Sequence, residues 1–219
     1  MSEMKNAFIF DFDGTLGETI PLVVATVTKS FHDLGLHAPS PSEIRSHFGP
    51  DELGLLRSLD FKNSDALYKH YLRNYKDMHS EYSSAPFSGI EDVLGLLSEN
   101  KIPTAIVTGK GRDSAEISLA QYGIADYFSV VECGSSAGVV KPQKMRRVLD
   151  IWKTDVKSTQ VFYVGDAVQD VYDSLEVGAI PISVAWSSVA DAEELRSTPT
   201  SRIFERVDDF QKWLVDSVL

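Results

Sequence analysis

Two aspartates, Asp11 and Asp13, stand one residue apart directly after the apolar run at 7–10. On an extended or tightly turning backbone, side chains at positions i and i+2 project to the same side, so the two carboxylates are expected to lie close together. Carboxylates this close repel each other, so either a cation neutralises them or one of them holds a proton. Gly14 leaves nearby backbone N–H groups free to approach an anion. The pair predicts a metal ion or a proton-carrying carboxyl, and both are useful in phosphoryl transfer.

Two further motifs offer groups that bind phosphate. Thr108 and Gly109 follow the apolar run at 104–107 and present a hydroxyl and backbone amides to phosphate oxygens. Lys141 precedes Pro142, which is expected to start a helix and to hold the lysine at its first turn. Because the chain is acidic as a whole, with a formal net charge of −11, a site for an anionic ester must supply its own positive charge.

A fourth motif places more acid near the same site. Asp166 follows the apolar run at 161–164, and Asp170 comes one helical turn later on the same face. Oxygen ligands from Asp11, Asp13 and Asp166 are those that a hard cation such as Mg²⁺ prefers. The sequence therefore predicts a magnesium site.

Short apolar runs recur along the chain and are expected to form the strands that position these motifs. Their ranges are 7–10, 104–107, 128–131, 161–164 and 180–184. Amphipathic helical spacing lies between them, as in the series Met145, Val148, Leu149 and Trp152. The alternation predicts an α/β fold with a doubly wound parallel sheet, covered by helices on both faces. Ligands of such sheets bind at the carboxyl ends of the strands, where all four motifs fall.

Residues from about 17 to 85 break this alternation, because they contain no convincing strand and show the pattern of successive amphipathic helices. We therefore expect an inserted helical domain at 17–85 and an α/β domain made of 1–16 and 86–219. The ends of the insertion, at Gly17 and 83–86, are expected to lie close together and to act as hinges.

The motifs DFDGTL at 11–16, Thr108, Lys141 with Pro142, and GDAVQD at 165–170 resemble, in order and spacing, those of the haloacid dehalogenase superfamily. The resemblance spans nearly the whole chain and implies that superfamily's Rossmann-like core. The helical segment resembles its first type of cap, as found in phosphoglycolate phosphatases and sugar-phosphate mutases.

The resemblance also implies roles for these residues. Asp11 is implied to attack phosphorus, and Asp13 to protonate the leaving oxygen and then to activate the water that hydrolyses the aspartyl phosphate. Thr108, Gly109 and Lys141 are implied to bind the phosphoryl oxygens. Independently of the resemblance, a carboxylate nucleophile needs no activating base at neutral pH, because its ordinary pKa is about 4.

The metal cofactor that the resemblance implies is Mg²⁺. Its protein ligands are implied to be Asp11, Asp166 and Asp13, the last through its backbone carbonyl, with Asp170 in a supporting position. Two further residues are candidates for contact with the leaving group: Lys110, next to the predicted phosphate site, and His47, in a turn of the helical segment.

Asp13 favours a phosphate ester over a haloacid, because dehalogenase-like members of the superfamily lack a second aspartate there. Phosphoglycolate, sugar phosphates, nucleotides and pyrophosphate all fit as substrates. A sugar-phosphate mutase of the β-phosphoglucomutase type is an alternative that uses the same aspartyl phosphate, and a phosphate-binding signalling module is a second alternative. Glu18 and Gly109 depart from the residues frequent in relatives, aspartate and asparagine, and either could change specificity.

The composition limits the partners. The acidic surface disfavours nucleic acid and anionic membranes, and no stretch approaches the ~18 apolar residues of a membrane helix. The start of the chain is unlike a signal peptide, and the single cysteine, Cys133, forms no internal disulfide. We expect a cytoplasmic enzyme whose partner is a small phosphorylated metabolite; a monomer and a homodimer fit the sequence equally.

Overall fold

The computed structural model describes residues 5–138 and 140–219, so residues 1–4 of the predicted α/β domain lie outside the described residues. The strands in the described part of the chain are β1 (Lys5–Phe10), β2 (Thr104–Val107), β3 (Val130–Glu132), β4 (Thr159–Gly165), β5 (Ile180–Val184) and β6 (Arg202–Phe204). They form one sheet in the order β3-β2-β1-β4-β5-β6, and every neighbouring pair is parallel. The predicted parallel α/β sheet is confirmed.

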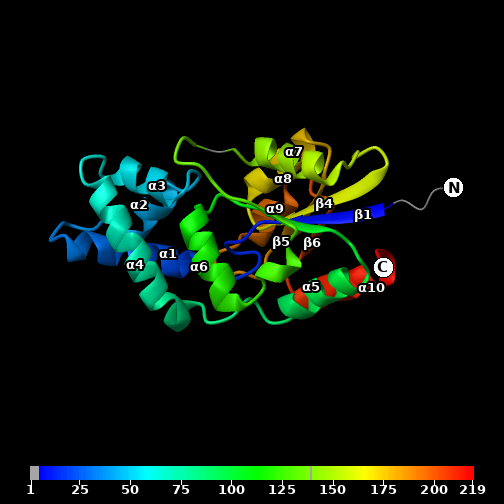
Figure 1. Ribbon diagram of the computed structural model, residues 1–219, viewed down its shortest axis with the longest axis horizontal. Coiled ribbons are helices and arrows are strands. Elements are labelled where there is room, and N and C mark those ends of the chain that lie inside the picture. The colour runs from blue at the N-terminus through cyan, green and yellow to red at the C-terminus, as the bar shows by residue number, and fades with distance from the viewer. Residues whose placement is uncertain (1–4, 139) are drawn as a thin grey trace.

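Helices cover both faces of this sheet (Figure 1). Those that follow the helical insertion are α5 (Ile90–Glu99), α6 (Arg112–Tyr122), α7 (Lys141–Trp152), α8 (Val168–Glu176), α9 (Ala192–Arg196) and α10 (Val207–Ser217), with a short 3₁₀ turn at Ala125–Tyr127. Alternate residues of β1 face opposite sides, as the period of a strand requires. Phe8 and Phe10 join the hydrophobic cluster under α5, α6 and α10, whereas Ala7 and Ile9 join the cluster under α7.

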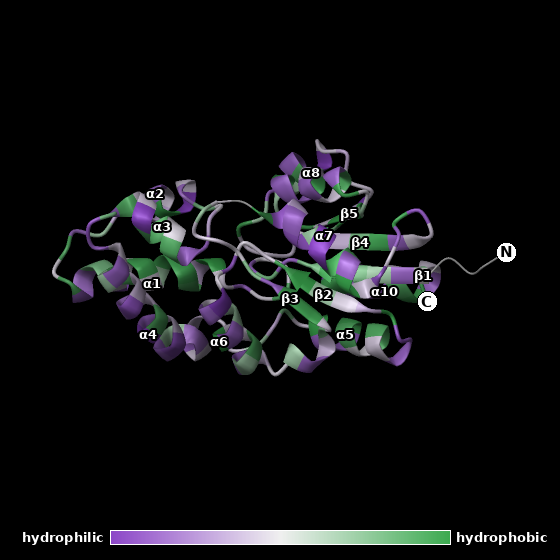
Figure 2. Ribbon diagram, turned by 45° about the horizontal axis from the view of Figure 1, so that its top comes forward, coloured by the Kyte–Doolittle hydropathy of each residue, from purple (hydrophilic) through white to green (hydrophobic). Residues whose placement is uncertain are grey.

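Four helices between β1 and α5 form a separate layer beside the carboxyl edge of the sheet (Figure 1). They are α1 (Ile20–Asp33), α2 (Pro41–Ser46), α3 (Glu52–Leu59) and α4 (Ser64–Tyr82). Their apolar faces pack into a hydrophobic cluster of their own, which includes Val27, Phe31, Leu56, Leu67 and Tyr71. Figure 2 shows the outer surface of α4 to be largely hydrophilic, as expected for an amphipathic helix that buries one stripe.

The two chain crossings between this helical layer and the sheet lie side by side. The Phe87 N–H donates a hydrogen bond to the Leu16 carbonyl, 3.0 Å away. Tyr122 of α6 touches both crossings: its hydroxyl lies 2.5 Å from Ser83 Oγ, and a Cβ built on Gly17 would lie 2.2 Å from the same hydroxyl. The two ends of the insertion are therefore held together by one side chain of the sheet domain.

The five predicted strands lie within two residues of their bounds in the structure, and the differences have physical reasons. The run expected at 128–131 forms a strand only over Val130–Glu132, because Ala125–Tyr127 make a 3₁₀ turn just before it. β6 was not predicted, since an edge strand of three residues is too short for a recognisable apolar run. The helix expected at Lys141 does begin there, with Pro142 in its first turn. None of the helices in the described residues combines the length and apolarity needed to cross a membrane.

Candidate active site

The carboxyl ends of three neighbouring strands open into one cavity of about 320 Å³. Asp11 follows β1, Thr108 follows β2 and Asp166 follows β4, and all three line the cavity. Because β2 and β4 flank β1 in the sheet, motifs far apart in the sequence meet at its centre. The helical layer forms the opposite wall, with Ile20, Val23, Phe48, Leu55 and Glu52 among its lining residues.

One side of the cavity holds a buried ionic group that lies entirely in the sheet domain. The Nζ of Lys141 lies 2.6 Å from Asp11 Oδ2 and 2.5 Å from Asp170 Oδ1. The Tyr163 hydroxyl supports the group from below by donating to the Val107 carbonyl, 2.8 Å away, and it lies 3.4 Å from Asp170 Oδ1. The predicted helix start at Lys141 thus places the lysine between two aspartates.

Burial shapes the titration of this group, which we call the Lys141 cluster (Asp11, Lys141, Asp166 and Asp170). Burial raises the pKa of Asp11 to about 6, while Lys141 opposes the rise and Asp170 adds to it. Burial, followed by the charges of Asp11 and Asp170, raises the pKa of Asp166 well above its ordinary value. Burial lowers the pKa of Lys141, but its two aspartate partners outweigh burial and hold that pKa well above its ordinary value. The three aspartates of the Lys141 cluster share one lysine, so the cluster has more acidic groups than basic ones.

The acidic part of the Lys141 cluster has the donor chemistry for a hard cation. Carboxylate oxygens of Asp11, Asp166 and Asp170 all lie within 4.8 Å of one another. The backbone leaves room for them: Gly14 has φ +76°, and a Cβ there would lie 2.1 Å from Asp166 Oδ2. An all-oxygen set of three carboxylates suits a divalent cation such as Mg²⁺. Asp170, expected in a supporting position, lies as close to this centre as the other two.

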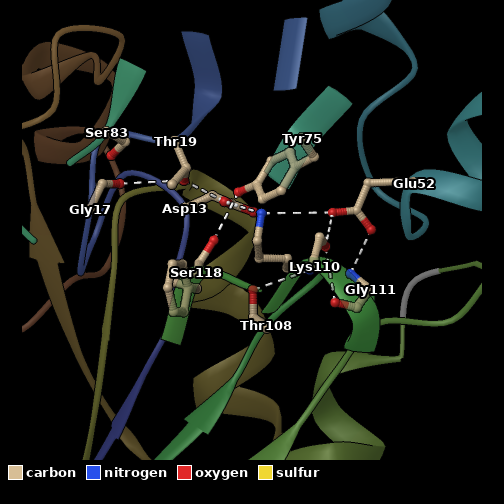
Figure 3. Close-up of polar contacts among 12 residues, drawn as sticks. Asp13, Gly17, Thr19, Glu52, Tyr75, Ser83, Thr108, Lys110, Gly111 and Ser118 are labelled. Atoms are coloured by element: carbon tan, nitrogen blue, oxygen red, sulfur yellow. Dashed lines mark hydrogen bonds and ion pairs between the residues drawn. The ribbon is translucent and has the colours of Figure 1, made fainter. Parts of the chain in front are cut away.

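The Asp13 carboxylate belongs to a second ionic group (Figure 3). Its Oδ1 accepts a short hydrogen bond from the Thr19 hydroxyl and lies 2.9 Å from Lys110 Nζ. The ammonium of Lys110 is also 3.7 Å from Glu52 Oε1 and lies over the ring of Tyr75, 4.6 Å from its centroid. Asp11 and Asp13, the two aspartates of the first motif, therefore belong to different ionic groups. Asp11 pairs with Lys141, and Asp13 pairs with Lys110.

Glu52 comes from the first turn of α3 and is almost completely buried, with 5% of its surface exposed. It accepts hydrogen bonds from the Gly111 N–H, at 2.7 Å, and from the Ser114 hydroxyl. These groups belong to the start of α6, so a carboxylate of the helical layer satisfies the open end of a helix in the sheet domain. Burial raises the pKa of Glu52, and Lys110 opposes that rise. We call Asp13, Lys110 and Glu52 the Lys110 cluster.

The structure brings nearly all of the predicted site residues together. Asp11, Asp13, Thr108, Gly109, Lys141, Asp166, Asp170 and Lys110 all line the cavity. His47 lies outside this lining, whereas the next two residues, Phe48 and Gly49, are part of it. Glu18 also faces elsewhere, because its carboxylate accepts hydrogen bonds from Ser187 Oγ and the Ser188 N–H.

Thr108 and Gly109 line the cavity at the carboxyl end of β2. The Thr108 N–H donates to the Glu132 carbonyl at 3.1 Å, and its hydroxyl accepts from the Lys110 N–H at 3.2 Å. A Cβ on Gly109 would meet only the Gly49 carbonyl, at an ordinary contact distance of 3.7 Å. Position 109 therefore has room for the Cβ of the asparagine that is frequent in relatives.

Two functional candidates were missed from the sequence, Glu52 and Thr19. Glu52 has the sequence signature of a surface acid in the first turn of a short helix, and only the packing of α3 against α6 reveals its contacts. Thr19 could have been found as the first hydroxyl after the DFDGTL motif. Asp173 of α8 also lines the cavity and is buried.

A family model for haloacid dehalogenase-like hydrolases matches residues 8–184. The chain therefore belongs to this family, as the resemblance of its four motifs predicted. The family is one of hydrolytic enzymes, and the four motifs quoted above all fall inside the matched range.

Individual relatives are similar over most of their length. A phosphoglycolate phosphatase from Neisseria meningitidis is 28% identical over 196 residues, which cover 84% of this chain and 82% of the relative. The pyrophosphatase PpaX from Oceanobacillus iheyensis is 25% identical over 209 residues, which cover 95% and 96%. The solved structure of a predicted phosphatase from Clostridium acetobutylicum has a TM-score of 0.78 at 20% identity and covers 97% of this chain and 99% of that one. That structure shows the same fold, and the names of the relatives agree with the predicted phosphatase class.

Proposed function

We propose that this chain is a Mg²⁺-dependent phosphatase that hydrolyses a small phosphomonoester through an aspartyl phosphate on Asp11. The observation that carries the proposal is the separation of the two aspartates, with Asp11 in a cation-binding cluster and Asp13 in a different hydrogen-bonded group. A nucleophile and a proton carrier need such different surroundings.

Asp11 fits the role of nucleophile. Lys141, 2.6 Å away, favours its ionised form, which attacks phosphorus without a general base. The Phe12 N–H donates to Asp11 Oδ1 at 2.7 Å and fixes the orientation of the carboxylate. Mg²⁺ held by Asp11, Asp166 and Asp170 would supply further positive charge against the phosphoryl oxygens.

Thr108, Gly109 and Lys141 fit the role of phosphate contacts. They stand around Asp11 on the same cavity wall and provide a hydroxyl, a backbone amide and an ammonium group. In the transition state of phosphoryl transfer, charge spreads over three equatorial oxygens, and these donors are suited to stabilise it.

Asp13 fits the role of general acid and base. Its carboxylate is more exposed than that of Asp11, with 24% against 9% of the side-chain surface accessible, and it faces the helical layer from which a leaving group would depart. The hydrogen bonds from Thr19 and Lys110 fix its orientation. In this position it can give a proton to the leaving oxygen and later take one from water.

We further propose that residues 17–85 are a cap over the α/β domain of 1–16 and 86–219. The separate hydrophobic cluster of α1–α4 and the adjacent chain crossings support this division. Closure of the cap would exclude bulk water while the phosphoryl group passes from the leaving oxygen to Asp11. A small phosphorylated metabolite fits a cavity of about 320 Å³; the cytoplasmic location stays a prediction.

Release of inorganic phosphate from p-nitrophenyl phosphate, with and without Mg²⁺, tests the proposal. We expect turnover that needs Mg²⁺ and is absent in Asp11→Asn. Isomerisation of a hexose phosphate without release of phosphate would identify a mutase instead. An Asp11→Asn variant with an unchanged rate would overturn the mechanism.

A further inference from the structure

The positive charges that face the cavity are few. Among the described residues that line it, the cationic side chains are Lys110 and Lys141, whereas the acidic ones are Asp11, Asp13, Glu52, Asp166, Asp170 and Asp173. Lys141 is already paired with Asp11 and Asp170 on the phosphate side of the cavity. Any anionic group on the leaving-group side would therefore depend on Lys110.

Lys110 is held away from such a group by Glu52. The side chain of Lys110 is completely buried, and its ammonium is shared between Asp13 and Glu52, at 2.9 and 3.7 Å. The two carboxylates offset the positive charge of the single ammonium, so Lys110 has no net positive charge left to attract a substrate anion. Figure 3 shows the Lys110 ammonium between the two acids, with Tyr75 closing the third side.

The position of Glu52 is fixed by close packing. Its Oε2 accepts from the Gly111 N–H, its Oε1 accepts from the Ser114 hydroxyl, and both bonds favour the ionised form. A Cβ on Gly111 would lie 2.4 Å from Oε2, so the backbone of α6 approaches the carboxylate as only a glycine permits. Glu52 is therefore part of a built contact between the two layers.

The remaining leaving-group wall is apolar. Ile20, Val23, Leu55 and Phe48, all from the helical layer, line the cavity there. An uncharged group with apolar surface would lose little on entering such a space. A carboxylate or a second phosphate would give up its hydration with no free cation to replace it among the described residues that line this cavity.

We propose that Glu52, by occupying Lys110, makes this site selective for phosphomonoesters whose leaving group carries no second negative charge. The proposal rests on the phosphatase function proposed above and specifies its substrate class. It makes Glu52 a positioning residue that acts through Lys110, and it disfavours phosphoglycolate relative to neutral esters of the same size.

A matched pair of substrates tests the proposal: phosphoglycolate and its amide, which differ in one charge and hardly in size. We expect the wild-type enzyme to have a kcat/KM for the amide at least about tenfold above that for the acid, because like charges in an enclosed site repel. In Glu52→Gln, which keeps the shape and leaves Lys110 with Asp13 as its one carboxylate partner, this ratio should fall by about tenfold, mainly through KM for the acid. Glu52→Asp, which keeps the charge, should retain the preference for the amide.

The control is Glu43→Gln, because Glu43 also lies in the first turn of a helix of this layer, α2, but is exposed. It should leave the ratio of the two substrates unchanged. A loss of packing alone would slow both substrates in Glu52→Gln and leave their ratio as it was, which would overturn the proposal. A wild-type preference for the acid would overturn it as well, whatever the variants do.

Arg45 is the residue that would explain the second of these outcomes. It is exposed and lines an adjoining cavity that shares Ile20, Phe48 and Asp166 with the first. A preference for the acid that disappears in Arg45→Gln would assign anion binding to Arg45 in place of the exclusion proposed here. If neither ester nor p-nitrophenyl phosphate releases phosphate, the phosphatase function itself fails, so the two failures are distinguishable.

Discussion

The two lysines of the cavity, Lys141 and Lys110, have similar surroundings but different dependence on the rest of the molecule. Each is buried, each lies between two carboxylates, and each contacts one aspartate of the first motif. All partners of Lys141 stand at the ends of strands or on helices that pack on the sheet. Lys110, in contrast, takes one of its two partners from α3 of the helical layer.

This difference separates a preorganised half of the site from an assembled one. The Lys141 cluster is held by β1, β4, α7 and α8, so its geometry does not depend on where the helical layer lies. The Lys110 cluster is complete only while α3 packs against the start of α6. Under the proposed mechanism, chemistry at phosphorus belongs to the first half and handling of the leaving group to the second.

The largest effect is expected in the preorganised half. Asp11→Asn should lower kcat by at least about 10⁴-fold, because it removes the proposed nucleophile and one of the proposed ligands of the cation together. Steady-state release of phosphate from p-nitrophenyl phosphate measures this change. Circular dichroism of the variant should remain that of the wild type, and a rate within tenfold of wild type would contradict the assignment of the nucleophile.

Lys141→Met should lower kcat by about 10²–10³-fold, the usual cost of removing one charge that stabilises a transition state. Lys69→Met, an exposed lysine on α4, is the control and should keep the wild-type rate. The comparison predicts that the loss in Lys141→Met is independent of the leaving group, because the proposed function places Lys141 against the phosphoryl group. If the loss of kcat differed strongly between aryl and alkyl esters, that result would contradict the division of the site into a preorganised half and an assembled half.

Substitutions in the Lys110 cluster are expected to change the free energy of unfolding. Lys110→Met leaves the buried Glu52 without a cation and should cost about 3–5 kcal/mol of unfolding free energy. Adding Glu52→Gln removes the unpaired charge and should restore part of the loss, with a coupling of about 1–3 kcal/mol. Urea unfolding of the two single variants and the double variant measures this coupling, and additive losses would show that the two side chains do not interact.

Magnesium should affect the two clusters differently. A cation bound among Asp11, Asp166 and Asp170 relieves their repulsion, so at about 100 times its Kd it should add about 2.7 kcal/mol of stability. Thermal unfolding with and without MgCl₂ measures the shift. It should be lost in Asp166→Asn and retained in Glu52→Gln, and retention in Asp166→Asn would move the cation away from this cluster.

The sequence predicted the preorganised half well and the assembled half poorly, for one physical reason. Asp11, Thr108 and Asp166 each follow an apolar strand, and parallel strands bring their carboxyl ends to one edge whatever the details of packing. Spacing along the chain was therefore enough to place them together. Asp170 was placed near them by its spacing of four residues from Asp166, although α8 begins only at Val168 and Asp166 precedes the helix.

No comparable rule connects the helical layer to the sheet. His47 was predicted to face the site, but the turn presents Phe48 and Gly49 instead, since the orientation of short helices depends on tertiary packing. Glu52 was missed because its sequence context is that of an exposed acid, whereas in the fold it contacts Gly111, Ser114 and Lys110. Residues that join two layers are the ones that one-dimensional periodicity leaves out.

The smallest expected effect distinguishes two glycines that flank Lys110. Gly111→Ala would place a Cβ 2.4 Å from Glu52 Oε2, whereas Gly109→Ala would meet only the Gly49 carbonyl at 3.7 Å. The first substitution should cost about 1–3 kcal/mol by overpacking, and the second should stay within about 0.5 kcal/mol. Urea unfolding measures both.

Gly111→Ala should also affect substrate preference. In the helical layer, the atom nearest to the new Cβ is Glu52 Oε2. The substitution should therefore displace Glu52 from Lys110 and shift the ratio of amide to acid turnover in the same direction as Glu52→Gln. Equal effects of the two alanines would mean that the helical layer yields freely at this contact, and the Lys110 cluster would then be no more than a loose association between the layers.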